Sequence, residues 1–210
     1  SGAGAIIKPP ELGIKTASKL EEVIGLEKLD HLMCFLKTKD REIIKQLMHS
    51  REIGVISFTG STEVGKILSI NAGSGLKRFV GELGGINPFI IFSDADIEKA
   101  VTDLVIRKTK AAGQACSAQN ILFLEKDIAN DVIEKIESKF FEIESLPTDK
   151  YASALMGPIR TKKALEDLYS FEERLNQSGA RCIINKNQKH VGDGFFYNPA
   201  AYLCEEPDLF

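Results

Sequence analysis

The sequence predicts an α/β fold built on parallel β-strands, and three observations lead to this prediction. Short apolar runs of strand length alternate along the chain with longer segments whose apolar residues follow the period of a helix. Turns rich in Gly, Ser, Asn and Asp separate these segments. One run, at 54–58, leads directly through a Gly/Ser/Thr turn into a helical segment. Strands that alternate with helices form parallel sheets, because each helix returns the chain to the same edge.

The region before residue 81 is expected to hold both strands and helices. Gly25 suits the C-terminal cap of the first helix, and Asp40 suits the N-terminal cap of the second. Residues 26–36 are ambiguous, because their apolar residues fit either a helix or a buried strand. The apolar spacing places strands at 5–8, 54–58 and 76–80, and helices at 16–24, 41–48 and 64–72.

The rest of the chain continues the alternation. Ser93 or Asp94 is expected to cap a helix, Thr161 opens a further helix, and Gly179 lies just past the end of that helix. Polar loops are expected at 142–151 and 185–194. The expected strands are 88–92, 121–124, 180–184 and an extended segment at 195–204, and the expected helices are 95–110, 127–141 and 161–177.

The composition is that of an ordinary soluble globular protein, with 43% hydrophobic and 27% charged residues among 210. A formal net charge of −3 gives no basic footprint, so no nucleic-acid partner is expected. No apolar run approaches the roughly 20 residues needed to span a bilayer. The N-terminus also lacks the charged and apolar regions of a signal peptide. We therefore expect a cytoplasmic protein without a membrane partner.

The four cysteines are expected to be thiols in a reducing compartment, since they form neither a CxxC pair nor a dense disulfide framework. Cys34, Cys182 and Cys204 are expected to be buried and to pack as small hydrophobes. The three histidines are scattered along the sequence, so no metal site is expected.

Two short motifs bracket the region from Gly81 to Asn120. Cys116 lies among small, turn-compatible residues, and taken alone it fits either a packed core thiol or a nucleophile. Glu82 lies among glycines that allow close approach of a ligand or a positive φ, and taken alone it fits either a solvated carboxylate or a general base. A strand and a helix separate the two, which lets them reach one crevice from different loops. We interpret Cys116 as attacking a carbonyl and Glu82 as activating water.

A third motif, residues 59–65, follows a strand and opens a helix. Such a turn binds phosphate, because free backbone N–H groups and the helix dipole both favour an anion. Turns of this composition are common, so the motif is weak by itself. Lys8 and Glu11 are weaker still, since a cation and a carboxylate three positions apart also fit a surface ion pair.

Taken together, in this order and spacing, the motifs resemble the NAD(P)-dependent, non-acylating aldehyde dehydrogenase superfamily. Residues 8–11, Lys-Pro-Pro-Glu, are similar to the segment of that family that holds the adenosine ribose of the cofactor. Residues 58–65 look like the turn that carries the cofactor pyrophosphate. Residues 82–85 look like the segment of the general base, and residues 113–116 like the segment of the nucleophile.

The resemblance implies a Rossmann-like parallel sheet segment followed by part of a second α/β catalytic domain. Residues 1–82 would be the C-terminal part of the NAD(P)-binding domain, and residues 83–210 the N-terminal part of the catalytic domain that bears the thiol. The family's members form homo-oligomers and act on small aldehydes.

The resemblance also implies a reaction. Cys116 attacks the aldehyde to give a thiohemiacetal, hydride passes to NAD(P)⁺, and Glu82 activates the water that hydrolyses the thioester. The backbone N–H of Cys116 contributes to the oxyanion hole. The expected cofactor is NAD, because the Glu11 carboxylate repels a 2′-phosphate, and NADP stays open as an alternative. Six residues are expected at the cofactor: Lys8, Glu11, Gly60, Ser61, Leu83 and Gly84.

The chain also departs from the family, whose members are longer. The segments that supply the oxyanion-hole asparagine and that grip the nicotinamide ribose are not found in these 210 residues. Residues 26–37 stand in place of a glycine-rich segment on the adenine side of the cofactor. The chain is thus expected to be a central fragment that lacks the N-terminal and C-terminal parts. Two hypotheses follow: the chain carries the chemistry of aldehyde oxidation, or it is a truncated or degenerate homologue without dehydrogenase activity, a folded fragment or binding piece.

Overall fold

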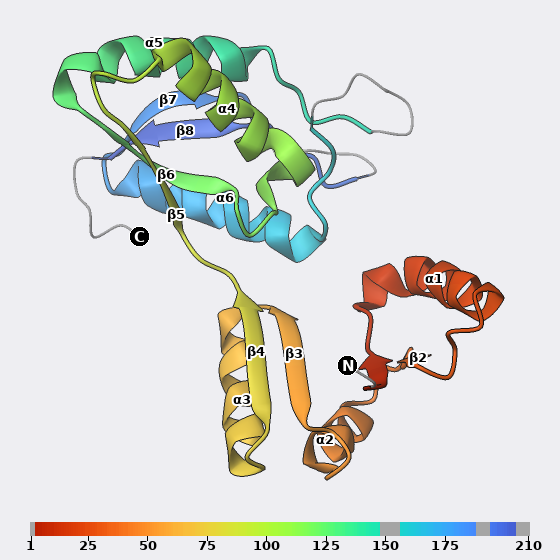
Figure 1. Cartoon of the computed structure of the whole chain (residues 1–210). Coiled ribbons are helices and arrows are strands. Elements are labelled where there is room, and N and C mark those ends of the chain that lie inside the picture. Colours follow the sequence, from red (N-terminus) through yellow and green to blue (C-terminus); the bar gives the residue numbers. More distant parts are fainter. Residues whose placement is uncertain (1–2, 148–155, 188–193, 205–210) are drawn as a thin grey trace. The chain divides into compact units, whose positions relative to one another are not determined.

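The computed structural model describes residues 3–147, 156–187 and 194–204 (Figure 1). The chain divides into two compact units, Ser1–Leu83 and Gly84–Phe210. Each unit combines helices with strands, and most of the strand pairs are parallel. The prediction of an α/β fold is therefore confirmed.

The first unit holds two pairs of parallel strands. β1 pairs with β2 and β3 pairs with β4, and α3 packs against β4 (Figure 1). The region that was ambiguous in the sequence, 26–36, contains the short strand β2 rather than a further helix. The elements are β1 (Ala5–Ile7), the 3₁₀-helix η1 (Glu11–Gly13), α1 (Ile14–Leu26), β2 (Met33–Phe35), α2 (Arg41–His49), β3 (Val55–Gly60), α3 (Thr62–Ser74) and β4 (Arg78–Leu83).

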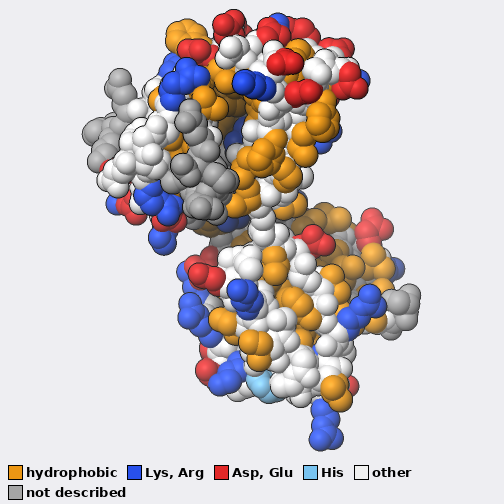
Figure 2. Space-filling model, turned by 90° about the vertical axis from the view of Figure 1, so that its left-hand side faces the viewer, with side chains coloured by type: hydrophobic (Ala, Val, Ile, Leu, Met, Phe, Trp, Pro, Cys, Tyr) orange, Lys and Arg blue, Asp and Glu red, His pale blue; other side chains and the backbone are white. Residues whose placement is uncertain are grey.

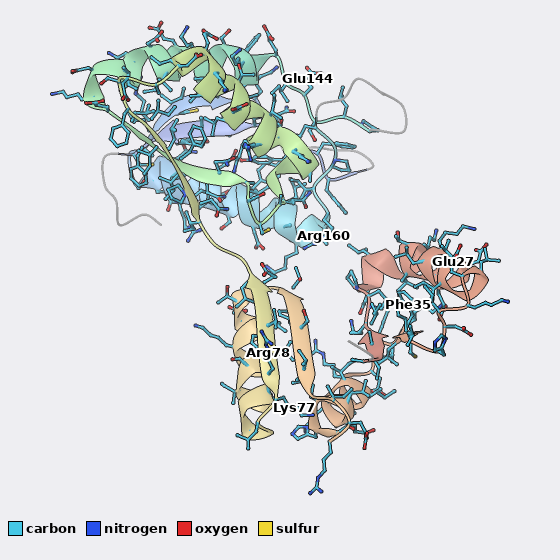
Figure 3. All side chains as sticks on the ribbon, in the orientation of Figure 1. Glu27, Phe35, Lys77, Arg78, Glu144 and Arg160 are labelled. Carbon is cyan, nitrogen blue, oxygen red and sulfur yellow. The ribbon has the colours of Figure 1, made fainter. Side chains whose placement is uncertain are left out.

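Side-chain hydrogen bonds define the start of α2 and connect the segment after it to β4. The Asp40 carboxylate accepts a hydrogen bond from the Glu42 N–H at 2.9 Å, which confirms Asp40 as the cap of α2. The Lys77 ammonium donates to the carbonyls of Ser50 and Ile53, so it joins the segment after α2 to the start of β4 (Figure 3). The prediction that Gly25 caps α1 is wrong, because the helix continues through Leu26.

The second unit holds one parallel and one antiparallel pair of strands. β5 pairs with β6 in parallel, whereas β7 and β8 are antiparallel, an exception to the predicted parallel pattern. α4 and α5 lie on one side of these strands and α6 on the other (Figure 1). The elements are β5 (Asn87–Ile91), α4 (Ile97–Thr109), η2 (Lys110–Gly113), β6 (Gln119–Leu124), η3 (Lys126–Ile128), α5 (Ala129–Phe141), α6 (Lys162–Gln177), β7 (Arg181–Asn185) and β8 (Ala200–Leu203).

The caps of the second unit confirm one prediction and correct another. Thr161 caps α6 by accepting from the Ala164 N–H at 3.1 Å, and Gly179 takes a left-handed φ of 81° just past the helix end. Neither Ser93 nor Asp94 caps α4. Asp96 does so, because its carboxylate accepts from the Lys99 N–H at 3.0 Å.

The main hydrophobic core lies in the second unit. Ile91, Val101 and Val132 are its most completely buried side chains, contributed by β5, α4 and α5. The first unit buries fewer apolar side chains, among them Phe35 of β2 and Ala72 of α3. Many large hydrophobic side chains are exposed, as the orange surface of Figure 2 shows. Exposed apolar surface of this kind is typical of regions that contact other polypeptide.

Candidate active site

The carboxyl ends of β3 and β4 bring four of the predicted site residues together in the first unit. The parallel register pairs Thr59 with Glu82 and Gly60 with Leu83. β3 ends at Gly60, β4 ends at Leu83, and Ser61 is the N-cap of α3. The Gly60–Ser61 turn and the glutamate segment are therefore neighbours at one edge of this sheet.

The N-terminus of α3 is closely fitted to β4. The Ser61 hydroxyl accepts from the Val64 N–H at 3.4 Å, and the Ser61 carbonyl accepts from the Gly65 N–H at 2.9 Å. Gly65 is buried, and a Cβ at this position would lie 2.5 Å from Cδ2 of Leu83. A glycine here lets the first turn of α3 approach Leu83 closely. The first N–H groups of a helix lack intrahelical acceptors, so this turn can bind an anion such as a diphosphate.

The structure corrects the local setting of Glu82. The sequence predicts a strand that ends at Val80, followed by a glycine-rich segment that bears the glutamate. In the structure β4 continues through Leu83, so Glu82 is a strand residue with an exposed side chain. A strand holds its backbone more firmly than a loop does, which favours a fixed position for the carboxylate.

Lys8 and Glu11 follow the end of β1. β1 pairs with β2, whereas Gly60 and Glu82 belong to the separate sheet of β3 and β4. The Lys8 ammonium donates to the Pro9 carbonyl at 3.2 Å. The Glu11 carboxylate forms an exposed ion pair with Lys39 at 2.8 Å. The hydrogen bond from Lys39 lowers the pKa of Glu11, and the charge of Lys39 adds to this effect. Glu11 is thus an anion with a lysine beside it.

Gly84 is the first residue of the second unit and is exposed. A Cβ on Gly84 or on Gly85 would meet nothing within 4 Å. Neither glycine is among the residues with a positive φ, so of the two possibilities that these glycines allow, the structure does not use a positive φ. The open space around them still allows the backbone to approach a ligand.

Cys116 follows a turn of unusual backbone conformation. Ala111, Ala112 and Gly113 take left-handed φ values of 52°, 55° and 70°. The helix predicted through Lys110 therefore ends at Thr109, and the chain reverses its local handedness before the cysteine. A left-handed conformation costs an L-residue other than glycine about 1–2 kcal/mol, so two alanines in it indicate that surrounding contacts determine this turn.

Side-chain amides hold the Cys116 loop on both sides. The Asn87 amide donates to the carbonyls of Cys116 at 2.6 Å and Ala118 at 2.9 Å. The Gln114 amide donates to the Pro158 carbonyl at 3.3 Å, and its oxygen accepts from the Arg160 N–H at 2.8 Å. The loop is thus tied to the start of β5 and to the segment before α6. The thiol of Cys116 itself is exposed.

Neither amide was assigned a site role from the sequence. Gln114 stands within the nucleophile motif, but its composition alone does not show what its side chain contacts. Asn87 carries no recognisable signal, because a polar residue before Pro88 is ordinary at the start of a strand.

The other cysteines correct a prediction. Cys34 and Cys182 are exposed and Cys204 is half-buried, so the expectation that all three pack in a core is wrong. Cys34 and Cys182 lie on β2 and β7, at positions of these strands that no other element covers. Exposure therefore does not distinguish Cys116 from Cys34 or Cys182.

The candidate groups are divided between the units. Glu82 belongs to the first unit, with a carboxylate beside an anion-binding turn, and Cys116 belongs to the second, with an exposed thiol in a tied loop. Chemically, these groups can supply a general base and a nucleophile. Among the described residues, no cluster of His, Cys, Asp or Glu side chains could hold a metal ion. In the same ranges, no helix is both long and apolar enough to cross a membrane.

Known proteins resemble this chain along almost its whole length. The sequence profile of the Aldehyde dehydrogenase family matches residues 1–207. A succinate semialdehyde dehydrogenase of Acinetobacter baylyi is 30% identical over 95% of this chain and 41% of its own length. A putative aldehyde dehydrogenase family 7 member A1 homolog of Dictyostelium discoideum is 26% identical over 89% of this chain and 36% of its own length.

Solved structures share the fold. A lactaldehyde dehydrogenase superposes with a TM-score of 0.93 at 22% identity, over 99% of this chain and 44% of that protein. An oxidoreductase from Marinobacter aquaeolei superposes with a TM-score of 0.91 at 27% identity, over 99% of this chain and 43% of that protein. This chain thus spans less than half the length of the proteins it matches.

Proposed function

Because the chain belongs to the aldehyde dehydrogenase family, we propose that it carries the nucleophile and the general base of an enzyme that oxidises an aldehyde to a carboxylic acid. The family as a whole uses NAD or NADP for this reaction. The observation that carries the proposal is the Cys116 loop, in which an exposed thiol is held by amide bonds to two other segments of its unit. Inert core thiols lack both the exposure and this support.

In the proposed mechanism, Cys116 acts as a thiolate. Its sulfur forms a bond to the aldehyde carbon, and the resulting oxyanion is stabilised by the backbone N–H of Cys116. A nicotinamide cofactor held by the first unit would supply the hydride acceptor, and loss of the hydride from the thiohemiacetal carbon leaves the thioester on Cys116. Glu82 then removes a proton from water, the hydroxide attacks the thioester carbon, and the Cys116 thiolate leaves as the carboxylic acid forms.

Two features of the first unit support the proposal that it binds a nicotinamide dinucleotide. The capped N-terminus of α3 offers backbone N–H groups for the diphosphate beside Gly60 and Ser61. Leu83 packs under that turn, and Gly84 follows it with open space around its backbone. We propose that Lys8 and Glu11 bind the adenosine ribose. Glu11 favours NAD, although the Lys39 ammonium beside it reduces the repulsion of a 2′-phosphate.

The competing function is that of a folded piece without dehydrogenase turnover. It is favoured by the length of the chain, which is less than half that of the relatives. The covalent half of the reaction at Cys116 needs no cofactor, so it can be tested on this chain alone. Calorimetric titration with NAD⁺ and NADP⁺ tests cofactor binding separately, because a saturable heat of binding supports a cofactor site on this chain. Loss of this heat in Ser61→Asp would locate the site at the N-terminus of α3.

The central experiment measures the alkylation rate of each cysteine with iodoacetamide, followed peptide by peptide by mass spectrometry. A nucleophile activated by its surroundings has a larger thiolate fraction than an ordinary thiol, whose pKa is about 8.5. We expect Cys116 to react at least about fivefold faster than Cys34 and Cys182 near neutral pH. Because these two thiols are also exposed, they are matched controls for access.

The same chain should hydrolyse p-nitrophenyl acetate through a covalent acyl intermediate at Cys116. Cys116→Ala should abolish this esterase activity, whereas Cys34→Ala should leave it unchanged. Equal alkylation of the exposed cysteines, together with esterase activity that survives Cys116→Ala, would overturn the proposal for this chain.

A further inference from the structure

Three lysines follow the strands of the β1–β2 sheet. The two strands are parallel, so their carboxyl ends meet at one edge, where the Leu36 N–H donates to the Ile7 carbonyl at 2.8 Å. Lys8 follows β1, and Lys37 and Lys39 follow β2. Open α/β sheets bind their ligands outside the carboxyl ends of the strands. This edge of the sheet is therefore basic at the place where such a sheet binds a ligand.

Lys39 contacts the carboxylate of Glu11, which opens the short helix η1. The Lys39 ammonium lies 2.8 Å from Oε2 of Glu11. The hydrogen bond from Lys39 lowers the pKa of Glu11 most, and the charges of Lys39 and Lys8 lower it further. Glu11 is thus an anion between two cations. The two ammonium groups outnumber the carboxylate, so this corner of the sheet keeps an excess of positive charge.

The bond between Lys39 and Glu11 is easily exchanged. The two side chains are 70% and 58% exposed, and an ion pair in water contributes little to stability. Lys39 can therefore leave Glu11 for another anion at little cost. Lys37 differs, because its ammonium is held on α1 by the Glu21 carboxylate and by the Ser18 hydroxyl at 3.3 Å. Of the two lysines after β2, Lys39 is the one that is available to a ligand.

The proposed function places the adenosine ribose of the cofactor at Lys8 and Glu11. In dinucleotide sites of this kind, a carboxylate binds the ribose 2′-hydroxyl of NAD, whereas a nearby cation accommodates the 2′-phosphate of NADP. Glu11 alone favours the hydroxyl. Lys39 is within hydrogen-bond distance of the same carboxylate, so it also reaches the group that Glu11 binds. The site thus holds both kinds of side chain.

We propose, building on the proposed function, that Lys39 determines the cofactor specificity of this chain by binding a 2′-phosphate, so that the chain accepts NADP as well as NAD. With NAD, Glu11 accepts from the 2′-hydroxyl and Lys39 stays paired with Glu11. With NADP, Lys39 leaves Glu11, donates to the 2′-phosphate and offsets the repulsion between that phosphate and the carboxylate.

Calorimetric titration of the 210-residue chain tests the proposal with two pairs of ligands. Adenosine 2′,5′-bisphosphate and 5′-AMP differ by the 2′-phosphate alone, and so do NADP⁺ and NAD⁺. We expect Lys39→Met to weaken binding of the 2′-phosphorylated member of each pair at least about tenfold, because a charge-assisted hydrogen bond is lost. Binding of 5′-AMP and NAD⁺ should change less than about twofold. Lys39→Arg should keep most of the affinity for the 2′-phosphate, since it keeps a cationic donor.

Lys19→Met is the matched control. The Lys19 ammonium lies 2.8 Å from Glu22 on α1 of the same unit, and these two side chains are also 70% and 58% exposed. The control removes the same charge from an equivalent ion pair, so it reports the general attraction of anions by a basic surface. It should leave the ratio of the two affinities in each pair unchanged. Glu11→Gln should act in the opposite direction to Lys39→Met, raising the affinity for the 2′-phosphorylated ligands.

Three results would overturn the proposal. These are a loss in Lys39→Met that is equal for both members of a pair, an unchanged ratio in that variant, and the absence of saturable heat with either 2′-phosphorylated ligand. Each can occur while NAD⁺ still binds and Cys116 still reacts faster than Cys34, and the proposed function then stands without this specificity. Slow alkylation of Cys116 beside a shifted affinity ratio has the reverse meaning, because it contradicts the proposed reaction and supports the role of Lys39.

Discussion

The residues just before Cys116 store conformational strain beside the proposed nucleophile. Ala112 is buried and Gly113 lies so close to the Lys108 carbonyl that a Cβ there would be 3.1 Å from its oxygen. A side chain at position 113 would therefore be crowded, and the buried Ala112 takes a conformation that alanine does not prefer. A turn that is fixed by its surroundings presents the following thiol in one position, which is what a nucleophile requires.

Asn87 is the residue whose replacement should show how far Cys116 depends on that support. Asn87→Asp keeps the shape of the side chain but replaces an amide donor with a carboxylate facing the carbonyls of Cys116 and Ala118. We expect amide exchange of residues 114–119 to rise at least about fivefold, since about 1–3 kcal/mol of hydrogen bonding is lost. The alkylation rate of Cys116 should fall toward that of Cys34.

Asn71→Asp is the matched control, because the Asn71 amide also donates to a backbone carbonyl, that of Ile67 at 2.7 Å, but in α3 of the other unit. It should leave both readouts at Cys116 unchanged. If Asn87→Asp leaves exchange in the loop at the native rate, Asn87 does not position the nucleophile. If Cys116 of the unmodified chain reacts no faster than Cys34, that result contradicts the proposed function and does not test the role of Asn87.

At the scale of elements, the start of α3 carries the anion-binding turn, and its cap can be tested directly. Ser61→Ala removes the side-chain acceptor of the Val64 N–H. Loss of such a cap costs about 0.5–2 kcal/mol, so exchange in the first turn of α3 should accelerate by several-fold or more. Hydrogen exchange resolved by mass spectrometry measures this.

Ser69→Ala in the same helix is the control, because the Ser69 hydroxyl bonds back to the Lys66 carbonyl at 2.9 Å and caps nothing. Alanine has the higher helix propensity, so Ser69→Ala should slow exchange in α3 slightly. Equal effects of the two substitutions would contradict a capping role for Ser61.

Elements were predictable where a local signal sets them. Asp40 and Thr161 were identified as caps because an Asp or Thr stands directly before an amphipathic run. The cap of α4 was misplaced because Ser93, Asp94 and Asp96 all satisfy the same rule, and only the structure shows that the Asp96 carboxylate accepts from the first turn of the helix. The four site motifs were identifiable because their residue types and order form a pattern that each lacks alone.

The remaining features depend on contacts that sequence does not display. The left-handed turn at Ala111 and Ala112 runs against the strong helix preference of alanine. The exposure of Cys34 and Cys182 depends on which positions of β2 and β7 other elements cover. Asn87 acts across 29 residues of sequence to reach Cys116, so no local pattern marks it.

At the scale of the whole molecule, the two units differ in whether tyrosine fluorescence can report on their unfolding. All four tyrosines lie in the second unit, at positions 151, 169, 197 and 202, and the chain has no tryptophan. Tyrosine fluorescence therefore reports on the second unit alone. The main hydrophobic core of the chain also lies in the second unit. Unfolding followed by tyrosine fluorescence therefore measures the stability of the unit that bears Cys116.

The stability of the second unit should rise with pH through Lys108. Burial lowers the pKa of Lys108 in the folded chain, whereas the unfolded chain keeps an ordinary value of about 10.4. Between these two values the unfolded chain binds a proton that the folded chain has released, so the free energy of unfolding increases with pH. The slope cannot exceed about 1.4 kcal/mol per pH unit for one group.

Tyr197 has the opposite effect at higher pH, which sets the range of the measurement. Burial first, and then its hydrogen bond to Glu172, raise the pKa of Tyr197 above that of a free tyrosine. Above about pH 10 the unfolded chain loses a proton that the folded chain retains, so stability falls there. Burial also raises the pKa of Cys204, so this thiol lowers stability as pH rises above about 8.5. The contribution of Lys108 should therefore be measured below about pH 9.5 in chains that all carry Cys204→Ala.

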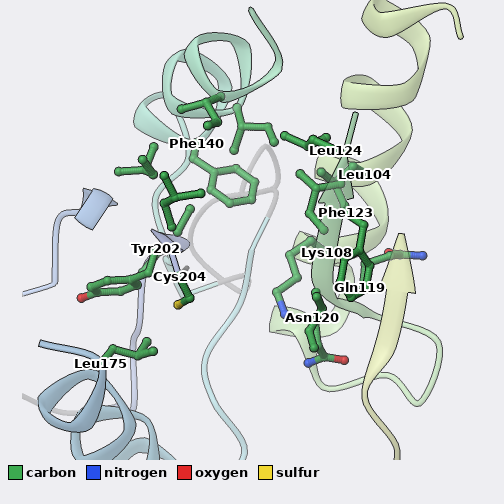
Figure 4. Close-up of a pocket in the computed structure, with 18 of the residues that line it drawn as sticks. Leu104, Lys108, Gln119, Asn120, Phe123, Leu124, Phe140, Leu175, Tyr202 and Cys204 are labelled. Atoms are coloured by element: carbon green, nitrogen blue, oxygen red, sulfur yellow. The ribbon is translucent and has the colours of Figure 1, made fainter. Parts of the chain in front are cut away.

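Urea unfolding followed by tyrosine fluorescence gives the decisive comparison. Lys108→Met should make the second unit more stable at about pH 7.5, because it removes the cost of a buried charge, and should abolish the rise in stability toward about pH 9.5. Lys126→Met, at an exposed lysine of η3 in the same unit, should keep that rise. If Lys108→Met retains the native pH dependence, the lysine is ionised without cost, and the cavity that it lines with residues of β6 and β8 (Figure 4) is polar.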